Sequence, residues 1–412
     1  MRVTILSQYF DPEPIPKAGD IARALRDHGH EVTVITGFPN YPSGRLYDSF
    51  KLRLLQRYEQ DGIPIIRTFE LPYHGKSVIG RIVNYCSFAL SAPLGALIGA
   101  RSDVMYVWHP PLTVGLAAWL ISVIRGMPFV YDVQDVWPES AVLSGLMKEG
   151  FLVRGMSMIE RFVYRRAAHI LVVTEGARQN LMAKGVPADK VTVMPNWVDE
   201  SLFDTSAEER REAVRSRLGW QGRFVVLFAG NLGLVQGLDS VVLAATHLPS
   251  SSKVLIALVG DGSDRERLVG LAREQHVEDR VQFVDRQPMS RMPEFMAASD
   301  ALLVHLRRSE LSRFIIPSKT LAYLAAGRPI IMAMEGAAAD LVSEAGAGIV
   351  IPPDDPVHLA RTIESLAAMR QNAVEQFGKN GRSYLQANLA KERVIARYEE
   401  LLSRVARKNG RA

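Results

Sequence analysis

The chain has 412 residues, of which 48% are hydrophobic and 23% are charged. A chain of this length is too long for one ordinary hydrophobic core, so we expect two or three domains. The formal net charge of +5 is mild. No nucleic-acid-binding motif accompanies the basic residues, which argues against a nucleic acid partner.

A single cysteine, Cys86, excludes an internal disulfide and fits a reducing compartment. The first ten residues lack the long apolar run of a signal peptide and predict a strand instead. We therefore expect the protein on the cytoplasmic side of the membrane.

The first half of the chain alternates apolar runs with helical segments. Val3–Ser7 predicts a strand, Asp11–Gly19 a loop and Asp20–His28 a helix. Apolar runs without alternation are typical of strands covered on both faces, and their repetition with helices predicts a parallel sheet with right-handed crossovers. The further strands predicted here are Val32–Thr36, Ile63–Thr68, Val104–Trp108, Phe129–Val133, Ile170–Thr174 and Val191–Met194.

The pattern restarts after a polar stretch, Asn196–Leu218, which we interpret as a linker with a short helix. The strands predicted next are Phe224–Phe228, Val254–Val259, Val281–Phe283, Ala301–Val304, Pro329–Met332 and Gly348–Ile351. Two successive doubly wound units predict an α/β fold with two Rossmann-like domains facing a central cleft. We expect domains at residues 1–200 and 201–387, with a helix over about 388–412 that crosses back onto the first domain.

Two parts of the chain suggest contact with a membrane surface. Ile79–Gly99 is strongly apolar but is interrupted by Arg81, Asn84 and Pro93, which favours a buried core helix over a transmembrane span. The alternative is a helix that dips into one leaflet, with Lys76, Arg81 and Arg101 reaching the head groups. A C-terminal basic run fits either a peripheral membrane contact or a solvated helix face; its members are Lys391, Arg393, Arg397, Arg404, Arg407, Lys408 and Arg411.

Two glycine-containing loops join a strand to a helix and are candidate anion sites. Gly19 lies in the first, Ile15–Asp20, where backbone N–H groups can face an anion, although a structural turn explains this loop equally well. The second loop follows Phe224–Phe228 and is the better pyrophosphate cradle, because two glycines flank an amide side chain. Its candidate donor-binding residues are Gly230, Asn231, Gly233 and Gln236.

A third anion site is predicted where Pro317 precedes a helix. Ser318, Lys319 and Thr320 place two hydroxyls and an ammonium at the helix N-terminus, where they can neutralise a diphosphate. A serine helix cap is the alternative. A lysine in the first turn opposes the helix dipole, however, which favours an anion. Arg313, on the preceding loop, is a candidate to share this role.

Polar side chains also follow two neighbouring strands of the first half. His109 and Asp135 lie at strand ends, at the edge where a parallel sheet binds its ligands. Trp137 and Glu139 add an aromatic ring and a second carboxylate, so that Asp135, Trp137 and Glu139 suit a carbohydrate acceptor. The candidate catalytic residues are therefore His109, Asp135, Lys319 and Arg313.

No Asp-x-Asp motif occurs in the sequence, and no His or Cys cluster has metal-ligand spacing. We therefore expect no metal and no other cofactor, so that Lys, Arg and helix N-termini would stabilise a diphosphate leaving group. A Walker loop is absent as well, which argues against an ATPase or a kinase.

Together these motifs resemble glycosyltransferase family 4, which has the GT-B fold, over nearly the whole chain. Their order and spacing are more specific than any one of them. The motifs are the Gly19 loop, His28–Val32, Pro195–Asp199, Gly230–Gly233, Val259–Gly262, Ala325–Pro329, Gly346–Gly348 and Pro352–Pro356. Within the family, Asp135–Ser140 and Ala229–Leu238 look like enzymes of bacterial capsule, O-antigen and exopolysaccharide synthesis, with fucosamine-type transferases as the nearest resemblance.

The resemblance implies transfer of a sugar, such as an N-acetylated deoxyhexosamine, from a nucleotide-sugar donor that we expect to be UDP-linked. The acceptor would be a polyprenyl-diphosphate-linked saccharide bound by the first domain at the membrane, with the donor on the second domain. On the same resemblance we add three residues to the expected donor-binding set, namely Asp261, Gly262 and Arg286. Family members usually retain the anomeric configuration without a protein nucleophile.

The chain departs from the family pattern at four positions. Family members commonly carry Arg and Lys where this chain has Asn231 and Gln236, and two glutamates separated by seven residues where it has Phe314 and Ala322. The replacements expected on charge grounds are Lys319 and Arg313 for the cations and Glu310 for a lost carboxylate.

Two other functions fit the same fold. A nucleotide-sugar 2-epimerase would release a free sugar or an epimer without any acceptor. A non-catalytic nucleotide-sugar-binding subunit is suggested by the missing glutamates and cations, and it would show no transfer to any acceptor.

Overall fold

The computed structural model describes residues 1–412 except 76, 144–146, 204–209, 409 and 411–412. The chain forms two compact units. Unit 1 comprises residues 1–195 and 395–412, and unit 2 comprises residues 196–394. The chain thus enters unit 2 slightly before the expected boundary at 200, and its last helix returns to unit 1.

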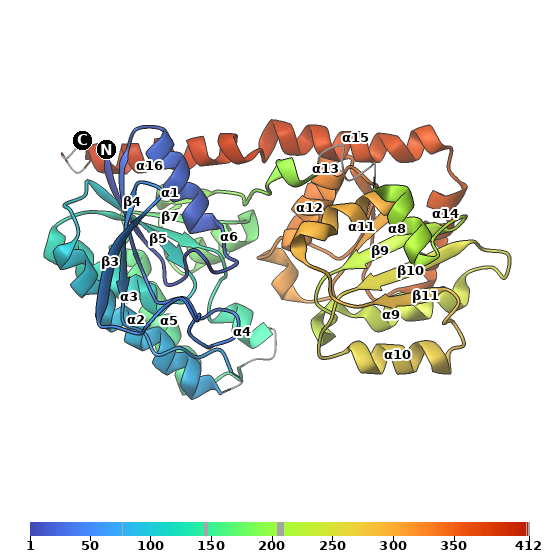
Figure 1. Ribbon diagram of the computed structural model, residues 1–412, viewed down its shortest axis with the longest axis horizontal. Coiled ribbons are helices and arrows are strands. Elements are labelled where there is room, and N and C mark those ends of the chain that lie inside the picture. Colours follow the sequence, from blue (N-terminus) through green and yellow to red (C-terminus); the bar gives the residue numbers. More distant parts are fainter. Residues whose placement is uncertain (76, 144–146, 204–209, 409, 411–412) are drawn as a thin grey trace. The chain divides into compact units, whose positions relative to one another are not determined.

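Unit 1 contains an eight-stranded sheet with helices on both faces (Figure 1). Its strands are β1 (Arg2–Leu6), β2 (Glu31–Thr36), β3 (Leu55–Gln60), β4 (Ile63–Thr68), β5 (Val104–His109), β6 (Phe129–Val133), β7 (His169–Val172) and β8 (Val191–Val193). Its helices are α1 (Lys17–Asp27), α2 (Val78–Ile98), α3 (Thr113–Arg125), α4 (Glu139–Leu143), α5 (Phe151–Arg166), α6 (Glu175–Ala183) and most of α16 (Lys391–Lys408), with a 3₁₀ turn η1 (Ala188–Lys190).

The strand order in unit 1 is β3-β4-β2-β1-β5-β6-β7-β8. All neighbouring strands are parallel except β3 and β4, and the order changes direction between β1 and β5, where Leu6 pairs with Val107. Ligands of doubly wound sheets bind beyond the carboxyl ends of the strands at such a switch point. The topology therefore directs attention to the residues that follow β1 and β5.

The antiparallel strand β3 is absent from the sequence-based prediction. Its sequence is polar and only partly buried, because it lies at the edge of the sheet, so it lacks the apolar run that marks the other strands. Asp61 and Gly62 join it to β4 with positive φ values of 53° and 72°. An Asp-Gly pair in a two-residue loop is a strong hairpin signal, and it would have identified β3.

Helix α1 begins three positions earlier than the predicted Asp20, at Lys17. Pro16 precedes it with φ −75°, a value already suited to a helix start. Gly19 therefore lies inside the first turn of α1 rather than in a loop. A side chain there would meet Arg23 and Asp11, which form an ion pair at 2.5 Å.

Helix α2 matches neither of the two expectations for Ile79–Gly99 completely, which were a buried core helix and a helix that dips into one leaflet. One side is buried against the sheet, through residues such as Phe88, Ala92 and Ala96. The other side is exposed but still apolar, with Ile79 at 75% and Leu90 at 80% exposure. By length and composition α2 is long enough to cross a membrane, and 39% of its most apolar stretch is buried in the protein.

Unit 2 is a six-stranded, wholly parallel sheet in the order β11-β10-β9-β12-β13-β14. Its strands are β9 (Phe224–Ala229), β10 (Val254–Val259), β11 (Val281–Val284), β12 (Ala301–His305), β13 (Ile330–Ala333) and β14 (Gly348–Ile351). The switch point lies between β9 and β12. Both sheets confirm the predicted α/β class with two Rossmann-like domains.

Helices cover the unit 2 sheet, and short 3₁₀ turns join several of them to the strands. The helices are α8 (Arg211–Leu218), α9 (Leu238–Ala244), α10 (Arg265–Glu274), α11 (Met292–Ala298), α12 (Ser318–Ala326), α13 (Ala337–Ala345), α14 (Pro356–Ala368) and α15 (Gln371–Asn388). The 3₁₀ turns are η2 (Glu200–Phe203), η3 (Leu234–Gln236), η4 (Ala245–His247), η5 (Met289–Arg291) and η6 (Glu310–Arg313).

A buried carboxylate, Asp132, joins the C-terminal helix α16 to the core of unit 1. Lys17 of α1 lies 3.1 Å from Asp132 of β6. The same carboxylate accepts hydrogen bonds from Tyr106 of β5 at 2.5 Å and from Tyr398 of α16 at 3.2 Å. Burial lowers the pKa of Lys17, and Asp132 opposes this shift. Asp132 thus holds α1, β5 and α16 together.

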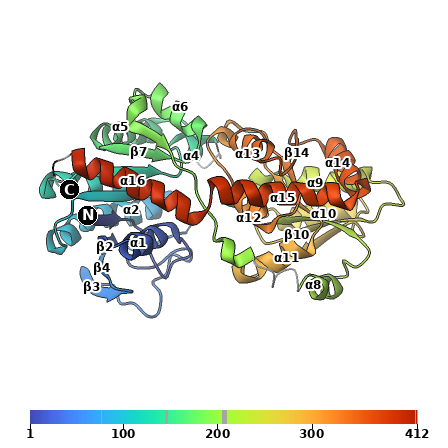
Figure 2. The same ribbon diagram turned by 90° about the horizontal axis from the view of Figure 1, so that it is seen from above.

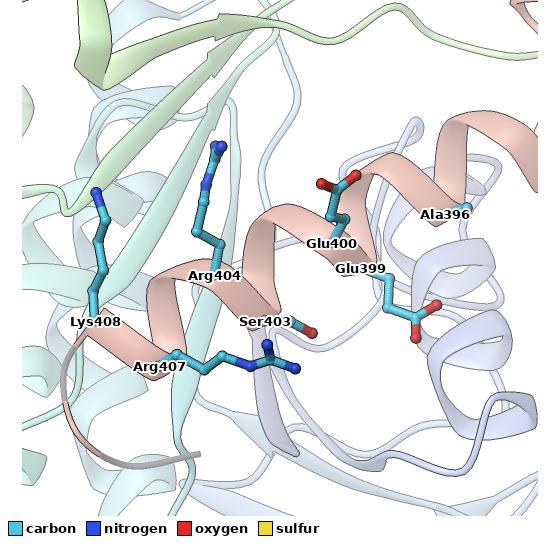
Figure 3. Close-up of a pocket in the computed structure, with 7 residues that line it drawn as sticks. All are labelled: Ala396, Glu399, Glu400, Ser403, Arg404, Arg407 and Lys408. Carbon is cyan, nitrogen blue, oxygen red and sulfur yellow. The ribbon is translucent and has the colours of Figure 1, made fainter.

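The basic residues of the C-terminal run lie on the outer side of α16. Its buried side consists of apolar residues and includes Val394, Leu402 and Ala406. Figure 3 shows Arg404, Arg407 and Lys408 along a shallow groove of this helix, with Glu399 and Glu400 beside them. This mixed-charge arrangement favours a solvated helix face over a membrane contact; Arg411, the last member of the run, lies outside the described residues.

Helices α16 and α2 lie on opposite faces of the unit 1 sheet (Figures 1 and 2). A flat surface therefore cannot engage the basic face of α16 and the apolar face of α2 at the same time. The two parts of the sequence that suggested membrane contact are separate features of the fold. Lys76, expected to reach the head groups near the start of α2, lies outside the residues that the structure describes.

Replacing Tyr398 by Ala should destabilise unit 1. The ring is fully buried and its hydroxyl bonds Asp132, so we expect a loss of about 3–5 kcal/mol in the free energy of unfolding. Urea denaturation followed by circular dichroism measures the change. Tyr398→Phe, which removes only the hydroxyl, should cost about 1 kcal/mol. Equal effects of the two substitutions would contradict this role of the buried ring.

Candidate active site

The glycine loop of unit 2 follows β9 at the switch point. Its backbone lies against the β10 loop, because Leu232 N donates to Asp261 O at 2.9 Å and Gly230 N donates to Val259 O at 2.9 Å. Gly230 has φ 143°, and a Cβ on Gly262 would lie 2.4 Å from Leu232 O. The two loops thus approach one another closely, as glycine alone permits.

Two of the predicted donor-binding side chains, Asn231 and Gln236, lie against the glycines of these loops. The Asn231 amide lies beside Gly233 and Gly262, where added Cβ atoms would meet its nitrogen at 2.8 Å and its oxygen at 2.7 Å. Gln236 Oε1 accepts from Gly233 N at 3.2 Å. The structure therefore brings together the amide side chains and the glycines that the sequence predicted as a cradle.

Lys319 lies next to the same loop. Its Nζ lies 3.5 Å from the ring centroid of Phe228. A Cβ on Gly230 would lie 3.0 Å from the same Nζ atom. The main chain of Ala229 donates to the Tyr323 hydroxyl at 3.0 Å, which ties α12 to the end of β9. Burial alone lowers the pKa of Lys319 to about 7. An ammonium in this position favours an anion above the glycine loop.

The first turn of α12 does not use a serine cap. Pro317 occupies the N-cap position without a side-chain hydrogen bond, and Ser318 is exposed inside the helix. The structure therefore contradicts the alternative of a serine cap. Thr320 is fully buried, and its Oγ1 has no hydrogen-bond partner. An unpaired buried hydroxyl beside Lys319 is a second polar group that a ligand could satisfy.

Arg313 and Arg286 are exposed. Arg313 is in η6 and forms an ion pair with Glu310 at 3.1 Å, with 58% and 68% of the two side chains exposed. Glu310, the weaker candidate for a lost family carboxylate, is thus engaged with Arg313. Arg286 lies beyond the carboxyl end of β11, next to Asp285, which pairs with Arg265.

A polar cluster at the end of β12 was missed by the sequence reasoning. His305 Nδ1 lies 2.6 Å from Gln236 O, and Arg307 forms a bidentate pair with Asp239 at 2.7 and 2.8 Å. A Cβ on Gly237 would meet Arg307, His305 and Asp354. The cluster fixes the loop that carries Gln236. The sequence contains a signal for this cluster, because His305 and Arg307 come just after the predicted strand Ala301–Val304, and residues at strand ends near a switch point are candidate ligand contacts.

In unit 1, His109 ends β5 at the switch point. Its ring is 1% exposed, lies 5.6 Å from the ring of Tyr131, and has an Nδ1 without a hydrogen-bond partner. Burial lowers the pKa of His109 to about 3. The imidazole is therefore neutral at physiological pH and suited to hydrogen bonding rather than to carrying charge.

Asp135 and Trp137 follow β6 and are half-buried. Burial raises the pKa of Asp135, and Trp137 N donates to Asp135 O at 3.1 Å. The two residues thus form one compact turn next to the strand that carries Asp132. The half-buried positions of both residues in one turn agree with its expected polar and aromatic character.

Glu139 begins α4 and belongs to a buried charged cluster that the sequence did not predict. Lys184 lies 2.7 Å from Glu139 Oε1 and 2.8 Å from both oxygens of Glu160. Burial raises the pKa of Glu160 to about 7, although Lys184 opposes this shift. Glu139 Oε2 is buried without a partner. Lys184 therefore holds Glu139 in place while leaving one of its oxygens unpaired.

In the part of the chain that the structure describes, no group of three or more His, Cys, Asp or Glu residues is placed to hold a metal ion. Each unit has its own candidate residues. In unit 2 the structure gathers Gly230, Asn231, Gly233, Gln236, Asp261, Gly262 and Lys319, and in unit 1 it places His109 and the Asp135–Glu139 turn at neighbouring strand ends.

Comparison with known proteins agrees with this architecture. The family model described as a glycosyl transferase 4-like domain matches residues 16–197, and the model of the glycosyl transferases group 1 matches residues 210–384. The Escherichia coli (strain K12) glycosyl transferase WcaI, whose name links it with colanic acid biosynthesis, is 25% identical over 97% of this chain and 98% of its own. The glycosyltransferase WbjE of Pseudomonas aeruginosa is 28% identical over 70% of this chain and 71% of its own.

Solved structures share the fold. HepE of Anabaena, crystallised with UDP, superposes with a TM-score of 0.73 at 19% identity, covering 98% of this chain and 100% of its own. The lipopolysaccharide glycosyltransferase WaaG superposes with a TM-score of 0.65 at 18% identity, covering 98% and 99%. Since the two family models together span both units, the chain belongs to the GT-B glycosyltransferases, with a glycosyl transferase 4-like domain followed by a group 1 domain.

Proposed function

We propose that the protein transfers a sugar from a UDP-linked donor to a lipid-linked saccharide in the synthesis of a bacterial surface polysaccharide. The observation that carries this proposal is the Lys319 ammonium beside the Gly230 loop. WcaI, which matches 97% of this chain and whose name links it with colanic acid biosynthesis, supports a role in polysaccharide synthesis, and WbjE supports glycosyl transfer. Structures of HepE with UDP and with UDP-glucose support a UDP-linked donor.

In this proposal unit 2 binds the donor diphosphate. The N–H groups of the Gly230–Gly233 loop and the Lys319 ammonium stabilise the charge that develops on the leaving diphosphate. Arg313, released from Glu310, adds a second positive charge. Because Lys319 supplies this charge and the sequence has no Asp-x-Asp motif, we propose that transfer needs no divalent metal.

Unit 1 binds the acceptor and the reacting sugar. His109 is neutral and donates or accepts a hydrogen bond to orient the donor sugar, and Asp135, Trp137 and Glu139 bind acceptor hydroxyls. On the resemblance to glycosyltransferase family 4, whose members usually retain the anomeric configuration without a protein nucleophile, we propose that the configuration is retained here. The leaving phosphate then accepts the proton of the acceptor hydroxyl. The transferred sugar is proposed to be an N-acetylated deoxyhexosamine of the fucosamine type, on the resemblance of Asp135–Ser140.

The lipid part of the acceptor fits the exposed apolar side of α2 and α3, which we name the α2–α3 face. Its members are Val78, Ile79, Ile82, Val83, Leu90, Leu94, Leu97, Ile98, Leu120, Val123 and Ile124. An exposed apolar patch of this kind is typical of a membrane contact, and Arg81, Arg101 and Arg125 at the helix ends suit anionic head groups. We propose that this face holds the protein on the inner surface of the cytoplasmic membrane.

The affinity for UDP should depend on the protonation of Lys319. Its pKa is about 7 in the free protein, and a bound diphosphate favours the charged form, so binding takes up a proton. Affinity should therefore be highest below pH 7 and fall as the pH rises from 7 to 9. Isothermal titration calorimetry with UDP measures this profile.

Lys319→Met should weaken UDP binding by about 10- to 100-fold, the size expected for a lost hydrogen bond to a charged group, and should flatten the pH profile. Lys253→Met, which removes an exposed ammonium at the start of β10, is the matched control and should bind UDP as the wild type does. Unchanged affinity in Lys319→Met would refute the assignment of Lys319 to the diphosphate.

The α2–α3 face should bind vesicles that contain phosphatidylglycerol. Replacing both Leu90 and Leu97 by Asp should reduce the co-sedimented fraction by roughly tenfold or more, because two apolar side chains no longer enter the interface. Met289→Asp, at an exposed apolar residue of unit 2, should leave binding unchanged. Equal binding by the wild type and the double variant would contradict a membrane role for this face.

A further inference from the structure

Four ring side chains gather at the switch point of unit 1, and none of them was a predicted site residue. Tyr9 follows β1 and Trp108 lies near the end of β5, with their rings edge to face at 6.1 Å between centroids. Tyr41 follows β2 and lies 5.4 Å from Tyr9. His74, between β4 and α2, lies 5.7 Å from Tyr9 and 5.1 Å from Tyr41. We name these four residues the aromatic cluster.

The aromatic cluster contains polar atoms without partners. Trp108 is 7% exposed and its Nε1 is buried without a hydrogen bond, and the Nε2 of His74 is also buried and unpaired. Leaving such a group unsatisfied costs about 1–3 kcal/mol, and native structures rarely do so without a reason. Burial and the nearby Arg81 lower the pKa of His74, so its ring is neutral. Packing alone does not explain two unpaired ring nitrogens at a switch point.

A buried hydrogen-bond network holds the loops that carry the cluster. Glu70 accepts from Gln8 at 2.8 Å and from Asn40 at 2.5 Å, which joins the loops after β1, β2 and β4. Glu13 accepts from the main-chain nitrogens of Asn40 at 2.9 Å and of Tyr41 at 2.8 Å. Because Glu13 and Glu70 hold Asn40 and the main-chain nitrogen of Tyr41, the loop that carries Tyr41 is positioned before any ligand arrives.

The cluster has an accessible side. Tyr41 and His74 are half-buried, whereas Tyr9 and Trp108 are nearly covered. A ligand can therefore approach Tyr41 and His74, and the covered ring nitrogens of Trp108 and His74 become reachable when these two half-buried side chains rotate. Rings combined with a few fixed hydrogen-bonding groups are the usual lining of a small-molecule site, and the apolar faces and hydroxyl rim of a pyranose match both components.

We propose that the aromatic cluster is the subsite for a pyranose ring of the acceptor saccharide, with its apolar face against Tyr41 and His74 and a hydroxyl accepting from Trp108 Nε1. This inference rests on the proposed function, since it assumes that unit 1 binds the acceptor. It assigns acceptor recognition to the loops after β1, β2 and β4, whereas the Asp135–Glu139 turn follows β6. Tyr9 supports the rings from beneath.

The indole signals of the protein provide a direct test. The chain has five tryptophans, so a protein labelled with ¹⁵N-tryptophan gives five indole N–H resonances, and Trp108→Phe identifies the one from Trp108. The probes are the methyl glycosides of glucose, galactose, mannose, N-acetylglucosamine and fucose. At least one of them should shift the Trp108 resonance in a saturable way. If none shifts it, the proposal is wrong.

Tyr41→Ala should lower the affinity for the glycoside that shifts the Trp108 resonance. The expected decrease is on the order of fivefold, the size expected for one lost ring contact. Trp119→Phe is the matched control, because Trp119 packs on Phe162 in α3 and α5 at 5.0 Å between centroids and lies outside the cluster. Unchanged affinity in Tyr41→Ala would remove Tyr41 from the subsite and overturn the proposal as stated.

Adding UDP to the same protein distinguishes a failure of the acceptor subsite from a failure of the proposed function. Stabilisation by UDP in a thermal melt, with no glycoside acting on Trp108, would overturn the acceptor subsite and leave the proposed function intact. Failure of UDP to stabilise the protein would count against the proposed function itself, whatever the glycosides do.

Discussion

The Lys319 ammonium lies against the ring of Phe228 at the end of β9, and no carboxylate contributes to its pKa, which burial alone lowers to about 7. Partial removal of the half-buried Lys319 ammonium from water costs free energy, which the Phe228 ring offsets in part and a bound anion would offset further. The neighbouring residues nevertheless hold the Lys319 side chain beside the glycine loop. Gly230 leaves room for it, and the Tyr323 hydroxyl ties its helix to the end of β9. The donor site proposed in unit 2 depends on this one constraint.

Lys17, a buried lysine, shows how a lysine with protein partners differs from the half-buried Lys319. Lys17 is removed from water, but Asp132 lies 3.1 Å away. Two tyrosine hydroxyls donate hydrogen bonds to the same carboxylate. All of its partners belong to the protein, so the pair holds elements together without needing a ligand. The same comparison applies to Lys184, which two glutamates enclose. Among these three lysines, Lys319 is the one whose pKa no carboxylate raises, and we therefore propose that its charge serves a substrate.

The sequence predicts the sheets well because their central strands are buried on both faces and therefore appear as continuous apolar runs. It fails at β3, whose polar edge sequence lacks that signal although Asp61-Gly62 marks the turn. It also predicts the glycine loop of unit 2, since glycine spacing is local. The aromatic cluster is different, because Tyr9, Tyr41, His74 and Trp108 are distant in sequence and only the strand order brings them together. The link of Lys184 to Glu139 and Glu160 is missed for the same reason.

Helix α2 connects the two kinds of surface that an amphiphilic acceptor requires. Asn84, on its buried side, donates to Leu71 O at 2.7 Å and accepts from Gln8, so it belongs to the network that fixes the aromatic cluster. Ile79 and Leu90, on its other side, are exposed and apolar. A saccharide bound at the cluster would therefore lie next to a helix whose outer side suits hydrocarbon. In the proposed function, the partial burial that made Ile79–Gly99 ambiguous in the sequence would allow one helix to contact both the sugar and the lipid of the same substrate.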